Sequence, residues 1–319
     1  MNMNDLGIDL YRTMYMIRRA EEAIQAHYGE DEMKTPMHMS MGEEAIAAGV
    51  CHALKWEDHI LGTYRSHGIY IAKTQETDLF FCEMYGKENG TSKGKAGSMH
   101  LLAPDAGLVC TSAIVGSSIP VSLGVAFANK RAGNGRMTAV FFGDGAIDEG
   151  VFWESLNFAC LKRLPLLFVC EDNGFAVHSP VSERHGYDSI ADIARAFKCD
   201  VLSSESTDVE QIHALAKDAV RMAKENERPV FLHLKYYRDL EHVGISEDFK
   251  AGYRPHAEFE KWKKLDPVRL QRERLLGTVG PEALAQVEKK IDAQIEKSLA
   301  VARQAAFPAA NVAAEDVYS

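Results

Sequence analysis

Apolar side chains recur at every third or fourth position in several stretches of this chain, which is the spacing of a helix that buries one face. The pattern predicts helices over residues 5–28, 42–54, 119–131, 149–162 and 208–225. Two further helices, rich in charged residues, are expected over 258–275 and 280–306. The first helix has no basic start followed by an apolar run, so it does not have the pattern of a signal peptide.

Three short apolar runs interrupt the helical spacing: MTAVFF at 137–142, LLFVCE at 166–171 and VFLHLKYY at 230–237. We expect strands there, and strands that alternate with helices form βαβ units and a parallel sheet. The Gly-, Ser- and Lys-rich stretch at 86–118 predicts an ordered loop, or backbone that lies close to another group. We therefore predict one α/β domain over residues 1–319, a doubly wound parallel sheet with helical N- and C-terminal extensions, the latter from about residue 256.

Composition removes several classes of partner. The chain is 46% apolar and 26% charged with a net charge of −10, which argues against a nucleic-acid partner. It has no run of 18 apolar residues, so no membrane span is expected. Its six cysteines form no C-x-x-C pair, which favours reduced thiols in a cytoplasmic protein.

Polar residues follow two of the predicted strands. Asp144 and Gly145 come after the first strand, and Asn173 follows the next. Ligands collect at the carboxyl ends of parallel strands, where a carboxylate and an amide oxygen suit Mg²⁺. The backbone carbonyl of Phe175 is a third candidate ligand, and Gly145 allows a turn that directs the backbone N–H groups at 145 and Ala146 toward a phosphate.

The spacing Gly-Asp-Gly, 27 residues, then Asn is specific, and the text GDGAIDEGVFWESLNFACLKRLPLLFVCEDNGF surrounds it. Glu154 and Asn157 match a helix motif E-x-x-N, and Leu164-Pro165 precedes the second strand. This region resembles the alpha subunit of the thiamine diphosphate-dependent decarboxylase component of 2-oxo acid dehydrogenases, of the pyruvate and acetoin dehydrogenase type. The resemblance runs from about residue 10 to 275.

The resemblance implies thiamine diphosphate and Mg²⁺ as cofactors, in the thiamine diphosphate-binding fold. Tyr64 and Arg65 match a Tyr-Arg pair that holds the diphosphate, and a planar guanidinium suits phosphate oxygens. The backbone at Ala113 and Val115 matches a Gly-Ile-Val-Gly segment that meets the aminopyrimidine, although Ala113 replaces the first glycine. Residues 94–100 look like the family's Gly-rich Ser-Met-His loop.

Two histidines match catalytic positions of the family. His38 is similar to a substrate-side histidine, and His242 follows Arg238 at the Arg-x-x-x-His spacing of the active-site loop. A histidine with a pKa near neutrality binds a carboxylate or moves a proton. His67 and His100 lie near the cofactor motifs and are weaker candidates.

The loop after His242 departs from the family pattern. Val243 stands where the pyruvate branch has a serine, so kinase control at that position is not expected. The pair Tyr253-Arg254 comes about two residues late, which leaves the 2-oxo substrate open.

The family takes the glutamate that activates the cofactor from a separate beta subunit, and this chain shows only the diphosphate-binding half. We therefore expect an α₂β₂ heterotetramer that acts on pyruvate, acetoin or a related small 2-oxo compound and passes the acyl group to a lipoyl carrier on an acyltransferase. One alternative is a carboligase or acyltransferase subunit in a biosynthetic pathway. Another is a nucleotide-binding or regulatory module, although no G-x-x-x-x-G-K-[ST] motif occurs.

Overall fold

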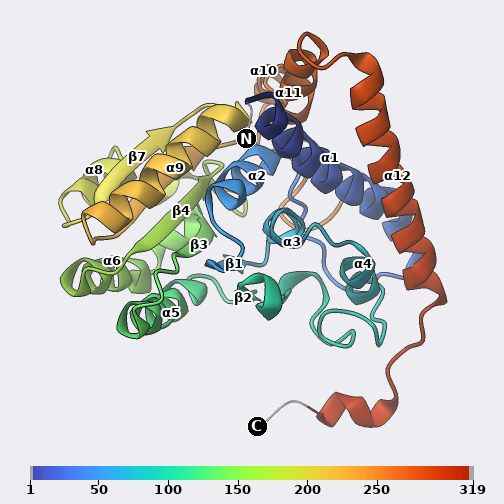
Figure 1. Cartoon of the computed structure of the whole chain (residues 1–319), viewed down its shortest axis with the longest axis horizontal. Helices are drawn as coiled ribbons and strands as arrows, with labels where there is room; N and C mark the ends of the chain where they lie inside the picture. The colour runs from blue at the N-terminus through green and yellow to red at the C-terminus, as the bar shows by residue number, and fades with distance from the viewer. Residues whose placement is uncertain (1–2, 316–319) are drawn as a thin grey trace.

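A six-stranded parallel sheet forms the centre of the computed structural model, which describes residues 3–315 of the chain (Figure 1). The strand order is β2-β1-β3-β4-β8-β7, and every neighbouring pair runs parallel. The strands are β1 His59–Thr63, β2 Leu108–Ser112, β3 Thr138–Gly143, β4 Leu166–Asp172, β7 Asp200–Ser204 and β8 Val230–Lys235. A separate two-stranded antiparallel hairpin pairs β5 Phe175–Ala176 with β6 Ser179–Pro180.

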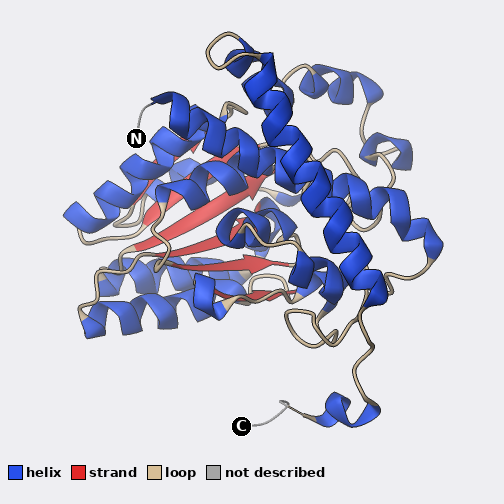
Figure 2. Ribbon diagram, turned by 45° about the vertical axis from the view of Figure 1, so that its right-hand side comes forward, coloured by secondary structure: helices blue, strands red, loops and turns tan. Residues whose placement is uncertain are grey.

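Helices surround this sheet, and Figure 2 shows the strands between two layers of them. The N-terminal half contributes α1 Met3–His27, α2 Glu44–Ala53, α3 His67–Thr74, α4 Asp78–Met84, α5 Ser118–Ala132 and α6 Gly150–Lys162. The C-terminal half contributes α7 Val181–Arg184, α8 Ile190–Arg195, α9 Val209–Glu225, α10 His256–Lys263, α11 Pro267–Leu276 and α12 Pro281–Gln304.

Alternate residues of each central strand enter two different cores, as the two-residue period of a strand requires. Ala139 and Phe141 belong to the core that also contains residues of α1, α2, α9 and α12, whereas Val140 and Phe142 belong to the core that contains residues of α5, α6 and α8. Both faces of the sheet are therefore covered, which explains why β4 is buried along its whole length. The predicted α/β class and doubly wound parallel sheet are confirmed.

The predicted elements and the observed ones agree best where the pattern is long. The helices at 5–28, 42–54, 119–131, 149–162, 208–225 and 280–306 are present with small shifts of their ends, as are the strands at 137–142, 166–171 and 230–237. No helix in the described part of the chain has the length and apolar character needed to cross a bilayer. The predicted domain bounds of 1–319 include terminal residues outside the described range and stay a prediction.

Two predictions of local structure were wrong. The single helix expected over 258–275 is two helices, because Asp266 caps a new helix with Pro267 at its first position. The side chain of Asp266 accepts from the backbone N–H groups of Val268 and Arg269. The stretch 86–118 was expected to be an ordered loop or backbone close to another group, but its residues 108–112 form strand β2 at the edge of the sheet.

Candidate functional site

The carboxyl ends of β3 and β4 bring Asp144 and Asn173 together. The two strands are neighbours in register, with Gly143 opposite Glu171, so the residues that follow them emerge at the same edge. The backbone N–H of Asn173 donates to Oδ1 of Asp144 at 3.3 Å. The two residues therefore lie next to each other, although 29 positions separate them, and their role as metal ligands stays a prediction.

A cavity of about 100 Å³ opens at this edge. Nine of the predicted site residues line it: Tyr64, Arg65, Val115, Asp144, Gly145, Ala146, Asn173, Phe175 and His242. The other two, Ala113 and His38, do not line the cavity. Ala113 follows β2 beside the exposed Ile114. His38 lies next to Tyr64, with their ring centroids 4.5 Å apart. The sequence motifs therefore converge on one place, while the roles assigned to these residues stay predictions.

Asp144 is fully buried at this edge of the sheet. Burial, followed by the charge of Asp172, raises the pKa of Asp144 to about 7. The guanidinium of Arg184 contacts Oδ2 of Asp144 and also bonds Asp148, and its charge opposes the rise. Arg184 was not predicted from the sequence. Its contact with Asp144 shows that this carboxylate accepts a cation in this position.

Asn173 completes a compact set of oxygen donors. Its Oδ1 accepts from the backbone N–H of Phe175 at 3.1 Å, and its Nδ2 donates to the hydroxyl of Tyr236 at 3.1 Å. Gly174 between them has a φ of 80°, which a glycine adopts without strain. The described residues contain no cluster of three or more His, Cys, Asp or Glu suited to a metal ion. A carboxylate, an amide and a main-chain carbonyl are nevertheless the donors that Mg²⁺ prefers, so the residues fit that ion.

Gly145 permits a close approach of two backbones. A Cβ at this position would lie 2.9 Å from the Cβ of Ala176, which is closer than real side chains come. The turn after β3 therefore packs directly on the hairpin that follows Asn173. This packing encloses the cavity on the side of residues 144–146 and 175–177.

Arg65 links two segments that flank the cavity. Its Nη1 donates to the carbonyl of Met39 at 2.6 Å, and its Nη2 donates to the carbonyl of His242 at 3.1 Å. The segments that carry the two predicted catalytic histidines are thus held on one guanidinium. Only 7% of Arg65 is exposed, so its guanidinium bonds buried groups of the site rather than solvent.

Three aromatic rings from distant parts of the chain meet beside the cavity. The ring of Tyr64 lies 4.5 Å from that of His38 and 5.3 Å from that of His242, and the two histidine rings are 5.3 Å apart between centroids. Burial, followed by the charge of Arg65, lowers the pKa of each histidine to about 3. Both imidazoles are therefore uncharged at pH 7.

A buried network fixes the loop that contains His242. Arg238 is 1% exposed, and it donates to the carboxylate of Asp248 at 3.0 Å and to the carbonyl of Val177 at 3.0 Å. Arg254 donates to the same Asp248 carboxylate at 3.2 Å, and the hydroxyl of Tyr253 bonds it as well. Tyr253 and Arg254 come about two residues later in the sequence than in the family pattern. Both side chains nevertheless bond the Asp248 carboxylate.

Two buried glutamates line the cavity and were not predicted. Burial raises the pKa of Glu43 to about 8 against the opposing charge of Arg65, and burial followed by the charge of Glu43 raises the pKa of Glu171. Oε2 of Glu43 and Oε1 of Glu171 have no hydrogen-bond partner. Burial thus disfavours the charged form of both carboxyl groups. Their signal in the sequence was an acidic residue directly before an apolar helix, for Glu43, and near the end of an apolar strand, for Glu171.

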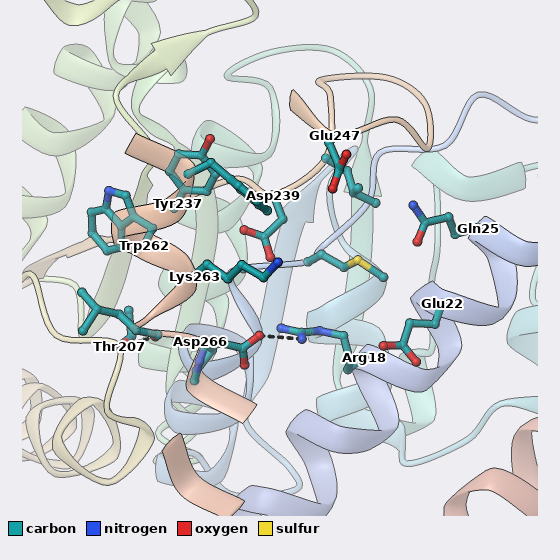
Figure 3. A pocket seen from close by; sticks show the side chains of 16 residues that line it. Arg18, Glu22, Gln25, Thr207, Tyr237, Asp239, Glu247, Trp262, Lys263 and Asp266 are labelled. Atoms are coloured by element: carbon teal, nitrogen blue, oxygen red, sulfur yellow. Dashed lines mark hydrogen bonds and ion pairs between the residues drawn. The ribbon is translucent and has the colours of Figure 1, made fainter. Parts of the chain in front are cut away.

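A second cavity of about 340 Å³ lies on the other side of the His242 loop. Figure 3 shows Asp239, Trp262 and Lys263 at this cavity, with Arg18 bonded to Asp266 below them. Burial, followed by the charge of Glu44, raises the pKa of Asp239 to about 7. This second cavity contains none of the predicted site residues.

Comparison with known proteins gives a family match over residues 12–311, to the dehydrogenase E1 component. Two relatives are alpha subunits of acetoin:2,6-dichlorophenolindophenol oxidoreductase. The one from Bacillus subtilis is 30% identical over 97% of this chain and 92% of its own, and the one from Cupriavidus necator is 32% identical over 98% and 93%. The alpha subunit of the pyruvate dehydrogenase E1 component from Zymomonas mobilis is 31% identical over 95% of this chain and 85% of its own.

Proposed function

Since the chain belongs to the dehydrogenase E1 component family, we propose that its cavity at the ends of β3 and β4 binds the diphosphate of thiamine diphosphate through Mg²⁺. The chain is an alpha subunit of the type found in thiamine diphosphate-dependent 2-oxo acid dehydrogenases, which are oxidoreductases. The observation that carries the proposal is the meeting of Asp144 and Asn173 in a buried cavity that Tyr64, Arg65 and Val115 also line.

Asp144, Asn173 and the carbonyl of Phe175 are the proposed Mg²⁺ ligands. The contact between Asp144 and the Arg184 guanidinium supports this assignment, because it shows a buried carboxylate that accepts a positive charge. A divalent ion at the same carboxylate also relieves the repulsion from Asp172 that raises its pKa.

The diphosphate is proposed to meet backbone N–H groups at Gly145 and Ala146, together with Tyr64 and Arg65. The N–H groups at the start of a helical turn have no partner within the turn, so they favour an anion. The backbone at Ala113 and Val115 is proposed to contact the aminopyrimidine ring. Once bound, the cofactor supplies the electron sink that decarboxylation of a 2-oxo acid requires.

His38 and His242 are proposed to bind and orient the 2-oxo substrate as neutral imidazoles. Their lowered pKa values suit hydrogen bonds to the substrate and proton transfer between neutral groups, rather than charge pairing with a carboxylate. Arg65 keeps both histidine segments beside the cavity and contributes the nearby positive charge.

A beta subunit is the proposed partner, in an α₂β₂ assembly with the cofactor between the subunits. The volume of about 100 Å³ supports a shared site, because pockets that enclose a whole organic ligand hold roughly 300–1,000 Å³. Exposed apolar side chains next to the cavity also support a shared site, since Ile114 is 71% exposed and Val115 is 44% exposed.

The acyl acceptor is proposed to be a lipoyl group on an acyltransferase, in the cytoplasm. The departure of the loop after His242 from the family pattern favours a second candidate, a carboligase or acyltransferase subunit. Parallel assays with lipoamide and with aldehyde acceptors, in the presence of the beta partner, separate the two.

The direct test compares the purified chain with the chain plus its beta partner. We expect Mg²⁺-dependent binding of thiamine diphosphate by calorimetry and decarboxylation of pyruvate or acetoin cleavage only with the partner. A full rate from the chain alone would contradict the shared site. Failure of the assembled protein to bind thiamine diphosphate would overturn the cofactor assignment itself.

A further inference from the structure

A Ser-His-Glu arrangement lies in the interior, outside the cavity described above. Nδ1 of His67 lies 2.7 Å from Oε1 of Glu21, and its Nε2 lies 2.7 Å from Oγ of Ser98. All three residues have no exposed surface, and the ring of Phe80 packs edge-on against His67 at 5.1 Å. No substrate reaches such a site, so the arrangement cannot act as a hydrolytic triad.

We propose that Glu21, His67 and Ser98 are positioning residues, which hold the His38 segment and the Tyr64-Arg65 segment in place at the cofactor cavity. This inference rests on the proposed function, because it takes the cavity as the cofactor site. The three residues come from α1, the start of α3 and the Gly-rich loop, so their hydrogen bonds join elements far apart in the sequence.

Glu21 holds the segment that contains His38. Its second oxygen, Oε2, accepts from the backbone N–H of Ser40 at 2.9 Å. The hydroxyl of Ser40 in turn accepts from the backbone N–H of Gly68 at 3.1 Å. One carboxylate therefore fixes both His67 and a backbone position two residues from His38.

Ser98 holds the other end of the same segment. Its backbone N–H donates to Oγ1 of Thr35 at 3.0 Å, while its hydroxyl bonds His67. With a carboxylate at Nδ1, that nitrogen of His67 donates, and Nε2 lies at hydrogen-bond distance from the Ser98 hydroxyl. Residues 35 to 40 are thus held at Thr35 by the Gly-rich loop and at Ser40 by α1.

The Gly-rich loop is itself rigid, because it wraps around the carboxylate of Glu83. Oε2 of Glu83 accepts from the backbone N–H groups of Ser92 and Gly94, and Oε1 accepts from those of Ala96 and Gly97. Glu83 is 1% exposed, and these four backbone donors satisfy both of its carboxyl oxygens. These hydrogen bonds therefore hold Ser98 in a defined position next to His67.

The segment between these anchors bonds directly to both sides of the cavity. The carbonyl of Met39 accepts from Arg65, and the carbonyl of Met37 accepts from the backbone N–H of Gly244 at 2.8 Å. A displacement of residues 37–40 therefore moves Arg65, His38 and the His242 loop together. Positioning of reacting groups is sensitive to shifts of this kind, since about 1 Å of misplacement costs up to roughly 100-fold in rate.

The test uses the assembled enzyme with its beta partner and compares Ser98→Ala with Ser298→Ala. Ser298 is a matched control, because it is also fully buried and its hydroxyl also bonds side chains, at Thr77 and Asp78, but it joins α12 to α4 away from the cavity. We expect similar melting temperatures for the two variants. Only Ser98→Ala is expected to lower kcat, by about tenfold, with KM for the 2-oxo acid changed by less than about twofold.

Hydrogen exchange gives a readout that does not depend on activity. The peptide that spans residues 36–41 is expected to exchange faster in Ser98→Ala and in Glu21→Gln, and to be unchanged in Ser298→Ala. If Glu21→Gln does not fold, the comparison of the two serine variants still decides the question.

Equal kcat values for Ser98→Ala, Ser298→Ala and the unaltered enzyme, with unchanged exchange at 36–41, would overturn the positioning role. An unaltered enzyme that binds no thiamine diphosphate would instead overturn the proposed function, while the exchange data would still report whether the three residues hold the segment.

Discussion

Nη1 of Arg238 lies 3.3 Å from Nδ1 of His242. A guanidinium has only donors, so Nδ1 must accept this hydrogen bond and the neutral ring keeps its proton on Nε2. The four-residue spacing between the two therefore selects one tautomer of the histidine. The low pKa of His242 agrees with this, because Arg238 is among the charges that oppose a second proton on the ring.

His242→Ala is expected to lower turnover by about 100-fold or more, since the ring is a proposed substrate contact. The affinity for thiamine diphosphate should change by less than about threefold, because the proposed diphosphate and Mg²⁺ contacts remain. Steady-state kinetics and calorimetry on the assembled enzyme measure the two effects. His256→Ala, at an exposed histidine, is the control and should match the unaltered enzyme. A wild-type rate in His242→Ala would remove this residue from the mechanism.

Asp144→Asn is expected to weaken Mg²⁺-dependent binding of thiamine diphosphate by about 100-fold or more, because the amide carries no charge to hold the ion. Asp148→Asn is the matched control: Asp148 shares the Arg184 guanidinium but does not line the cavity. Titration calorimetry of both variants separates loss of a metal ligand from loss of an arginine partner. Equal losses in the two variants would contradict the metal assignment.

His38 should lower the unfolding free energy of the chain as the pH decreases. Its pKa falls from 6.5 to about 3 on folding, so its contribution to stability is complete above pH 6.5 and is lost as the pH falls toward 3. At pH 5 the loss amounts to at most about 2 kcal/mol of unfolding free energy. Chemical denaturation between pH 5 and 8 should show that the unfolding free energy of His38→Asn falls less steeply with decreasing pH than that of the unaltered chain. The exposed His256→Asn should keep the slope of the unaltered chain.

Asp239 should have the opposite effect at high pH. Its pKa rises from 3.8 to about 7 on folding, so its contribution is complete below pH 3.8 and is lost as the pH rises through 7. Asp239→Asn should therefore raise the unfolding free energy at pH 8 by about 2 to 4 kcal/mol, with the difference disappearing near pH 4. Urea unfolding at several pH values measures this. Asp218→Asn on the exposed face of α9 is the control, and an equal gain there would show that the burial of Asp239 is not the cause.

The sequence predicted the central strands and the long helices because their apolar spacing is regular over many residues. It missed β1 and β7 because these strands are five residues each and carry few consecutive apolar positions. It missed β2 because local glycine content suggested a loop, whereas pairing with β1 supplies the hydrogen bonds that stabilise the strand.

The site was predictable where a residue's role depends on a local motif. Asp144, Gly145 and Asn173 follow from strand ends, and Tyr64 and His242 follow from resemblance. Arg184, Glu43 and Asp248 were not predicted, since their importance arises only when the folded chain brings them beside a charge from another element. The pKa values of the two histidines could not be predicted for the same reason, because burial and the neighbouring arginines set them.

The backbone hydrogen bond between Gly244 and Met37 ties the loop that contains His242 to the segment that contains His38. His242 is pinned on one side by the His38 segment and on the other by Arg238, which Asp248 anchors. The residues between Gly244 and Asp248 are also tied back to the start of the loop, because the backbone N–H of Glu241 donates to the carbonyl of Ser246 at 2.8 Å and Leu240 pairs with Glu247. The separation of the two imidazoles therefore depends on the length of this closed loop, and a change of length there would shift the ring of His242.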